Sequence, residues 1–173
     1  HDIRLLRGLP HVTEMTHIAD LSRRELEDGT GETRRVDVVA ADANFFQFFR
    51  YVPREGRLFD RTDTESHARV CVLGNETARR MELDGPPVLL RFITVMGLRC
   101  RVIGRLQRVA RWDVPLGWDW DDVVVLPFDA MADHAATEVN NNHWLLLHTD
   151  SSDNNELVVR VVNALILNRH NNL

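Results

Sequence analysis

The chain has 173 residues, of which 44% are hydrophobic and 27% charged, so its composition is that of a globular protein and argues against wholesale disorder. Its 21 basic and 26 acidic residues give a net charge of −5 without a basic block, which disfavours a nucleic acid as the main partner. No uninterrupted apolar run reaches the ~18 residues that a membrane-spanning helix needs.

The first third of the chain predicts two strands and a short helix. In chain order the expected elements are the end of a helix over 2–8, a strand over 12–19, a loop or hairpin tip over 22–34, a strand over 34–41 and a helix over 42–49. Asp42 is expected to cap this last helix, and Phe45, Phe46 and Phe49 to face the core.

The middle third predicts a buried strand, a helix and a hairpin. The expected elements are a polar, loop-forming stretch over 54–68, a strand over 69–74, a helix over 75–81, a break over 84–87 and hairpin strands over 90–96 and 98–106. Asn75 is expected to cap the helix, and Gly97 to form the hairpin turn. Because Cys100 lies between Arg99 and Arg101, it should face inward while the arginines face water.

The last third predicts two more strands, each followed by a helix. The expected elements are a loop over 110–122, a strand over 122–127, a helix over 128–136, an asparagine-rich turn over 140–142, a strand over 143–149 and a helix over 153–170. Asp153 and Glu156 have the spacing of a capping box, and Val158 and Val162 belong to one apolar stripe. Strands and helices are mixed, with hairpins as well as crossovers, which indicates an α+β fold.

The two cysteines, Cys71 and Cys100, each lie in an expected strand. Two cysteines are too few for a disulfide scaffold or a zinc cluster. Two interpretations remain. Buried free thiols are the favoured one, and a single bridge between neighbouring strands is the alternative in an oxidising compartment.

The sequence lacks the common motifs of metal-binding, nucleophilic and phosphate-binding sites. His143 and His148 are five residues apart on an expected strand, so they point to opposite faces and cannot share a metal ion. The serines lack a G-x-S-x-G elbow, and the chain has neither a G-x-G-x-x-G nor a G-K-[ST] phosphate loop. The acidic residues Asp60, Asp63 and Glu65 lack the spacing of a calcium loop. We therefore expect a protein that is not an enzyme and needs no metal or cofactor.

The loop over 110–122 is the most unusual segment, because it holds three of the four tryptophans together with four aspartates. Trp112, Trp118 and Trp120 could anchor a partner, since tryptophan is frequent at interfaces. They could equally form a local core beneath a long loop. We keep both interpretations, with the three tryptophans as candidate partner-binding residues.

Several motifs in a fixed order resemble the extracytoplasmic core domain of MacB-type, FtsX-like ABC-transporter permeases. The residues that carry the resemblance in the first half are Asp42, Phe45, Phe46, Gly56, Arg57, Phe59, Asp63, 69–74 and 78–80. In the second half they are the sequences MGLRCRVIGRL (96–106), DDVVVLPFDAM (121–131) and LNRH (167–170). The chain departs from the family pattern at Leu89 and Leu90, where glycine and lysine are usual. This departure leaves the subgroup open.

The resemblance implies two lobes: a mixed β-α-β lobe, porter-like, from residues 1–55 and 123–173, and an inserted β-rich, sabre-like lobe from 56–122. It implies a place between the first two transmembrane helices of a longer parent, outside the cytoplasmic membrane. A first residue that is not methionine fits an excised segment.

The resemblance also implies a function. The domain would transmit the conformational change driven by a separate cytoplasmic ATPase to an adaptor, a substrate or another envelope partner, in efflux or lipoprotein export. A second permease copy is a further partner to expect. The alternative from a different class is a secreted or periplasmic module that binds a small ligand, with an aromatic lid and a deep apolar pocket beside Trp112 and Trp120.

Overall fold

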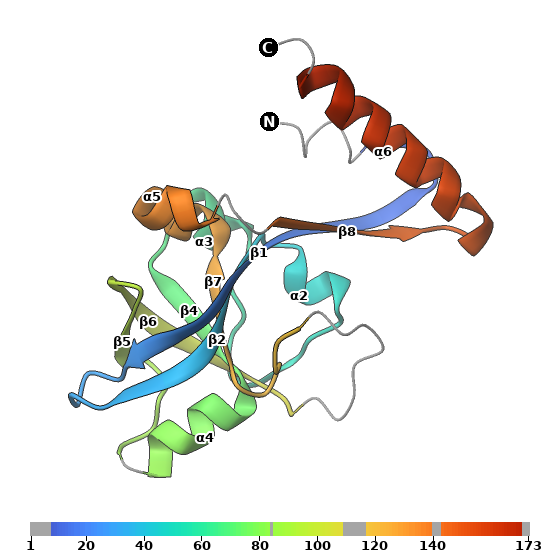
Figure 1. Ribbon diagram of the computed structural model, residues 1–173. Coiled ribbons are helices and arrows are strands. Elements are labelled where there is room, and N and C mark those ends of the chain that lie inside the picture. The colour runs from blue at the N-terminus through green and yellow to red at the C-terminus, as the bar shows by residue number, and fades with distance from the viewer. Residues whose placement is uncertain (1–7, 84, 109–116, 140–142, 171–173) are drawn as a thin grey trace.

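One long strand, β1 (Val12–Glu27), connects a ring of strands to a projecting arm in the computed structural model, which describes residues 8–83, 85–108, 117–139 and 143–170 (Figure 1). The other strands are β2 (Thr33–Ala41), β3 (Pro53–Gly56), β4 (Val70–Leu73), β5 (Phe92–Val95), β6 (Leu98–Leu106), β7 (Val123–Pro127) and β8 (His143–Thr149). The helical elements are α2 (Phe45–Phe48), α3 (Arg61–Glu65), α4 (Asn75–Leu83), α5 (Phe128–Val139), the 3-10 turn η1 (Ser152–Asn154) and α6 (Asn155–His170).

The ring is closed by backbone pairing. Its strands follow the order β2-β7-β4-β6-β5-β1, and β1 pairs again with β2. The pairs β2–β7 and β4–β6 are parallel, whereas the other pairs of the ring are antiparallel. β3 pairs with β6 outside this path. Parallel and antiparallel pairs thus occur in one sheet, and the predicted α+β fold is confirmed.

Two apolar cores lie on the two sides of the ring. The inner core takes buried side chains from all six ring strands and from Met81 of α4 and Met131 of α5. The outer core lies beneath α2 and includes Phe45, Phe46 and Trp120. Because successive side chains of a strand point to opposite faces, a strand between two cores must be apolar throughout. This explains the uninterrupted apolar sequences of β4 and β7, in which every residue is buried.

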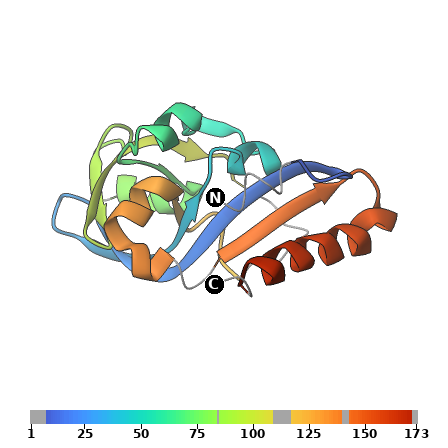
Figure 2. The same cartoon turned by 90° about the horizontal axis from the view of Figure 1, so that it is seen from above.

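The arm consists of the first half of β1, β8 and α6, and Figures 1 and 2 show it extending away from the ring. Met15 of β1 is buried against Val158 and Val162 of α6, so the helix covers one face of this two-stranded ribbon. On the opposite face, Phe48 of α2 stacks on His148 with ring centroids 4.0 Å apart. The arm is therefore packed on both faces.

Two stretches that we expected to be loops contain regular structure. The hairpin tip expected over 22–34 is confirmed, but it is limited to residues 28–32, because β1 continues to Glu27 and pairs with β2. The register of this pairing shifts beside Ser22, whose φ is 61°. The polar stretch 54–68 holds β3 and α3. Gly56 is required in β3 because a side chain there would collide with the backbone of Ile103. Charged residues occupy both stretches because one side of each element faces water.

Three expected helix caps are placed differently. Asp42 precedes α2, but its carboxylate accepts hydrogen bonds from Thr16 Oγ1 and the backbone amides of His17 and Asn44. Helix α4 begins at Asn75, whose Oδ1 accepts a hydrogen bond from Arg105 Nε at 3.1 Å. Ahead of the last helix, Ser151 caps the turn η1 and accepts a hydrogen bond from the amide of Asp153.

The remaining expected elements are confirmed where the structure describes them, including the hairpin of β5 and β6 and the inward position of Cys100. The turn over 140–142 and residues 2–7 of the helix end predicted over 2–8 lie outside the described residues, and Gly8 is in a turn. The division into lobes 1–55 with 123–173 and 56–122 stays a prediction. Strands from both predicted lobes pair in the same sheet, since β4 pairs with β7 and β5 with β1.

Candidate docking site around the tryptophan loop

The structure places the three candidate tryptophans differently. Trp120 is buried, with 4% of its surface exposed, and Trp118 is half-buried. Trp112 lies outside the described residues. The described part of the tryptophan loop, residues 117–122, therefore contributes at least one core side chain, and its role in binding a partner stays a prediction.

Trp120 sits in an aromatic cluster on the outer side of the ring. Its ring centroid lies 5.6 Å from Phe45, 5.3 Å from Phe49 and 5.6 Å from Tyr51, and Trp118 packs edge-on against it at 5.1 Å. Burial, and secondarily the charge of Asp121, raises the pKa of the Tyr51 hydroxyl well above its ordinary value. Aromatic rings thus surround Trp120 on the side that faces α2.

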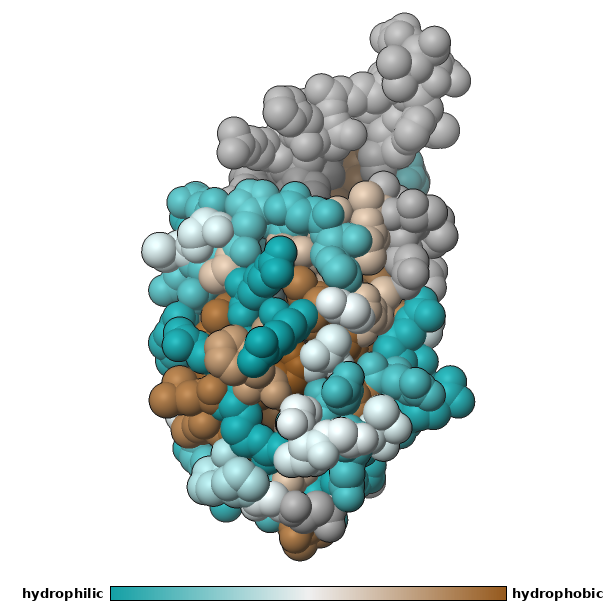
Figure 3. All heavy atoms as spheres, turned by 90° about the vertical axis from the view of Figure 1, so that its left-hand side faces the viewer, coloured by the Kyte–Doolittle hydropathy of each residue, from teal (hydrophilic) through white to brown (hydrophobic). Residues whose placement is uncertain are grey.

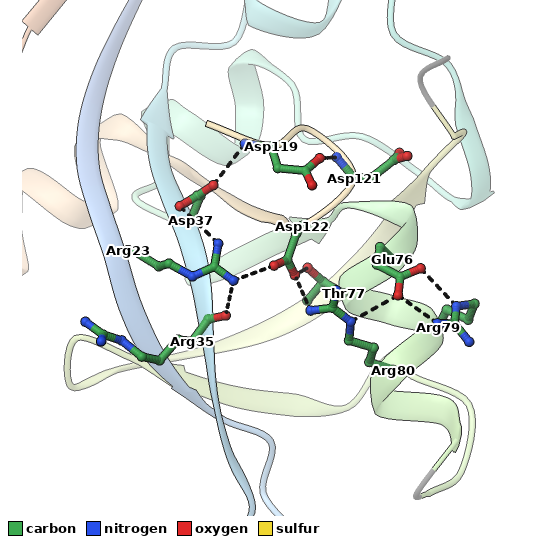
Figure 4. Close-up of polar contacts among 10 residues, drawn as sticks. All are labelled: Arg23, Arg35, Asp37, Glu76, Thr77, Arg79, Arg80, Asp119, Asp121 and Asp122. Carbon is green, nitrogen blue, oxygen red and sulfur yellow. Dashed lines mark hydrogen bonds and ion pairs between the residues drawn. The ribbon is translucent and has the colours of Figure 1, made fainter. Parts of the chain in front are cut away.

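The aspartate at the end of the same loop is buried between two arginines. Asp122 is 3% exposed, and its carboxylate lies 2.7 Å from Arg23 of β1 and 3.2 Å from Arg80 of α4 (Figure 4). Thr77 donates its hydroxyl to the same carboxylate at 3.2 Å. A buried charge needs such partners, because leaving it unpaired costs several kcal/mol. Asp122 therefore joins β1, β7 and α4 at one point.

The other two described aspartates of the loop, Asp119 and Asp121, also have defined partners. Asp37 of β2 accepts a hydrogen bond from the backbone amide of Asp119 at 2.9 Å and lies 3.7 Å from Arg23. Asp119 in turn accepts from the amide of Asp121 at 2.9 Å (Figure 4). These contacts fix the loop backbone against the ring. Within the part of the chain that the structure describes, no group of three or more histidine, cysteine or acidic side chains could hold a metal ion.

The acidic residues near α3 form a helix cap and ion pairs. Asp60 and Asp63 make a reciprocal capping box at the start of α3. Arg57 binds Asp63 with its Nη2 at 2.8 Å from Oδ1, and this hydrogen bond lowers the pKa of the Asp63 carboxyl. Glu65 pairs with Arg61. All three carboxylates are thereby engaged in local structure.

Both cysteines are free thiols buried in the ring, as the favoured interpretation expected. They lie on the neighbouring strands β4 and β6, where Cys71 is opposite Val102. Burial, followed by contact with Cys100, raises the pKa of the Cys71 thiol well above its ordinary value. A protonated thiol is a poor nucleophile, so Cys71 is a packing residue in this state.

Two histidines meet at the root of the arm. His17 of β1 and His143 of β8 lie 2.8 Å apart between Nε2 and Nδ1, and the His17 ring packs on Phe128 with centroids 4.4 Å apart. Burial, and then the neighbouring His143, lowers the pKa of His17 from 6.5 to about 4. Burial also lowers the pKa of His143.

Acidification should therefore weaken the fold through His17. The folded protein disfavours the protonated ring, so the unfolded chain binds the proton at higher pH. The stability that depends on a neutral His17 ring is fully present above pH 6.5 and is lost as the pH falls from 6.5 toward 4. When urea unfolding is measured at several pH values, the free energy of unfolding of His17→Gln should fall less with decreasing pH than that of the wild type. Leu83→Gln, at a residue that is 68% exposed and cannot titrate, should retain the wild-type profile, and an equal change in both variants would contradict this assignment.

Comparison with known proteins identifies the family to which the chain belongs. The MacB-like periplasmic core domain matches residues 1–165. The chain belongs to this family. It is accordingly an extracytoplasmic domain of a MacB-like ABC-transporter permease. No curated protein matches the chain by sequence. In the described residues, no helix is both long and apolar enough to cross a membrane.

Two solved structures share the fold of this MacB-like domain. The periplasmic region of MacB from Actinobacillus actinomycetemcomitans is 14% identical with a TM-score of 0.77, and the match covers 98% of this chain and 73% of that one. The extracellular domain of the noncanonic ABC-type transporter YknZ from Gram-positive bacteria is 18% identical with a TM-score of 0.76, over 94% and 81% of the two chains.

Proposed function

We propose that this domain is a non-catalytic mechanical transmitter in an ABC-transporter permease. ATP hydrolysis in a separate cytoplasmic subunit or domain would move the arm, and the ring would pass that movement to an adaptor, a substrate or another envelope partner. The efflux and lipoprotein-export types both fit this role. Membership in the MacB-like family supports the setting, and the contacts of the arm support the mechanism.

The single observation that carries the proposal is the continuity of β1. Its first half pairs with β8 in the arm, and its second half pairs with β2 and β5 in the ring. A hydrogen-bonded strand resists stretching, so displacement of the arm reaches the ring without crossing a flexible linker. Arg23, on the ring half, then connects β1 to the tryptophan loop through Asp122.

Contact between α6 and the ribbon is the second requirement for transmission. Val158 is 3% exposed and Val162 9% exposed, and both pack on Met15 of β1. Burial of side chains of this size contributes about 1.5–3 kcal/mol each. In this proposal the helix and the ribbon move as one body.

The tryptophan loop is our proposed site for the partner. The aspartate contacts fix residues 119–122 to β2 and α4, so this part of the loop would present the exposed part of Trp118 on a rigid support. Trp112 stays a candidate partner-binding residue. Rigid aromatic side chains lose little entropy on binding, which suits them to anchor an interface.

Val158→Asp in the complete transporter tests the proposal. A carboxylate facing Met15 should detach α6 from the ribbon at a cost of about 3 kcal/mol. We expect the exported substrate to remain in the cell while the ATPase subunit still hydrolyses ATP. Hydrogen exchange of the α6 amides would verify that the helix has detached.

Val159→Asp is the matched control, because the neighbouring side chain is 54% exposed on the same helix. It introduces the same charge at the next position of the helix, and transport should continue. Normal export by Val158→Asp, with α6 shown to exchange rapidly, would contradict a transmitting role for this contact.

A further inference from the structure

Two histidine rings join the start of β8 to β1 at the point where the arm meets the ring. Ile18 of β1 pairs with Trp144 of β8 on one side and with Ala41 of β2 on the other, so β1 belongs to both parts here. His143 is the first residue of β8, and its Nδ1 lies 2.8 Å from Nε2 of His17. Figure 1 shows this junction between the ring and the arm, close to α5.

The two rings meet edge to edge, in the arrangement of an imidazole–imidazole hydrogen bond. Their planes differ by 4° and their centroids are 4.9 Å apart, much farther than the 2.8 Å between the two nitrogens. One nitrogen must therefore carry a proton while the other offers its lone pair. Phe128 of α5 packs on both rings, with centroids 4.4 Å from His17 and 5.7 Å from His143. The histidine pair thus connects β1, β8 and α5.

Protonation changes what this contact can be. A neutral imidazole has one donor and one acceptor nitrogen, whereas an imidazolium has two donors. The hydrogen bond survives one added proton, because one ring still offers an acceptor. With two added protons, two donors face each other and two positive charges repel. Because the rings interact directly, they titrate as a pair.

The groups that face the pair do little to offset added protons. The carboxylate in contact with His17 is that of Asp42, which accepts from the His17 backbone amide at 3.3 Å and from Thr16 Oγ1 at 2.8 Å. β8 contributes the other member of the pair, His143, and α5 contributes the apolar ring of Phe128. Burial disfavours the charged form of both histidines and lowers the pKa of each.

The surface of the ring offers charged groups a different environment. Figure 3 shows hydrophilic side chains across one of its faces, with apolar side chains in separate patches among them. Water solvates the charges on such a surface, so their titration has little effect on structure. His17 is half-buried, and a proton therefore binds to it more readily once the junction has opened.

We propose that the His17–His143 pair is a pH-sensitive contact that holds the start of β8 on the ring. When both rings are protonated, the start of β8 separates from β1 and α5, and the arm stays attached through β1 and the contacts of α2. The family places this domain outside the cytoplasmic membrane, where the cytoplasm does not set the pH. Within the proposed function, on which this consequence rests, external acid would weaken the coupling of arm and ring.

Two backbone amides report on the state of this junction. Asp42 binds both the amide and the carbonyl of His17, on the side away from β8. Because the backbone groups of successive strand residues alternate between the two sides, those of Ile18 point toward β8. Trp144 is opposite Ile18, so its amide faces β1, as does the amide of Leu146 two residues later.

Native-state hydrogen exchange of the Trp144 and Leu146 amides tests the proposal. Exchange with little dependence on urea reports a local opening, whereas exchange with the urea dependence of ring amides such as Val125 reports global unfolding. We expect a local opening of the two amides. Its equilibrium constant, corrected for intrinsic exchange, should rise about tenfold or more between pH 7 and pH 5, because the open junction binds protons that the closed one resists.

His17→Gln is the decisive variant, because its amide can still donate or accept a hydrogen bond but carries no charge. The opening constant of the two amides should then depend little on pH. Leu83→Gln, at a residue 68% exposed on α4, should retain the wild-type dependence. His143→Gln, at the exposed member of the pair, should show a smaller dependence than the wild type, and it serves if His17→Gln loosens the arm at neutral pH.

Three results would overturn the proposal. In the first, both amides exchange at pH 5 only through global unfolding. In the second, they open locally to the same extent at pH 7 and pH 5. In the third, His143→Gln retains the full pH dependence of the wild type, which would show that His17 acts without its partner. Each of these results would leave the Val158→Asp experiment unaffected, because α6 packs on Met15 and not on the histidine pair.

Discussion

Trp120→Ala should lower the free energy of unfolding by about 3–5 kcal/mol, the largest effect that we expect from a single substitution. The indole is 4% exposed and contacts three aromatic rings of the outer core at 5.3–5.6 Å between centroids. Its removal leaves a cavity that the stiff segment around Phe45 and Phe49 cannot fill. Against the 5–15 kcal/mol that is typical of a whole domain, this loss is severe.

Urea unfolding followed by far-UV circular dichroism would measure the effect. Trp118→Ala is the matched control, because Trp118 is half-buried and packs against Trp120 from one side, so its loss should be smaller. Equal losses would contradict the assignment of Trp120 to the core. If Trp118→Ala lowers thermal stability and leaves partner binding intact, the docking role proposed for the tryptophan loop fails at that residue.

Asp122→Ala is the second substitution for which we expect a large loss, of about 3 kcal/mol. It removes the acceptor for Arg23, Arg80 and Thr77 at once. The arginine side chains are 46% and 42% exposed, so water can solvate part of their charge, which limits the loss. Most of the effect should come from the unpaired Thr77 hydroxyl and from the loss of the link between β1 and α4.

Asp122→Asn distinguishes charge from shape, because the amide oxygen can still accept from Thr77 while the attraction to both arginines is lost. We expect an intermediate stability in urea unfolding. Asp119→Ala, at an exposed residue of the same loop, should cost less than Asp122→Ala. A double variant with Arg23→Ala should lose less than the sum of the single losses, and strict additivity would show that Asp122 and Arg23 are not coupled.

Much of the fold could be predicted because its signals are local. The alternation of apolar and charged residues at the start of β6 predicts that Cys100 faces inward and the flanking arginines outward. The apolar sequence of β7 predicts a buried strand. The motif order indicated the family, which the match over residues 1–165 confirms. Periodicity and motif order survive in a single sequence because each depends on neighbouring residues.

The contacts that fix the candidate site could not be predicted, because they join distant segments. Arg23 and Asp122 are 99 residues apart, and neither position is unusual in its own surroundings. The polar sequence of 22–34 predicts a loop, but residues 22–27 belong to strand β1, whose outer face is solvated there. The capping signal of Asp153 and Glu156 was equally ambiguous, because Ser151 is nearby and caps the preceding turn.

The pairing of β1 with β8 has a consequence for the order of folding. Glu14 and His148 are 134 residues apart, so closing the arm requires almost the entire chain. Contacts of such long separation form late, because the loop that they close has a large entropic cost. On the ribosome, the first half of β1 would emerge before β8 and remain without this partner until β8 is synthesised. This domain is therefore most vulnerable to mispairing during export, before its last strand arrives.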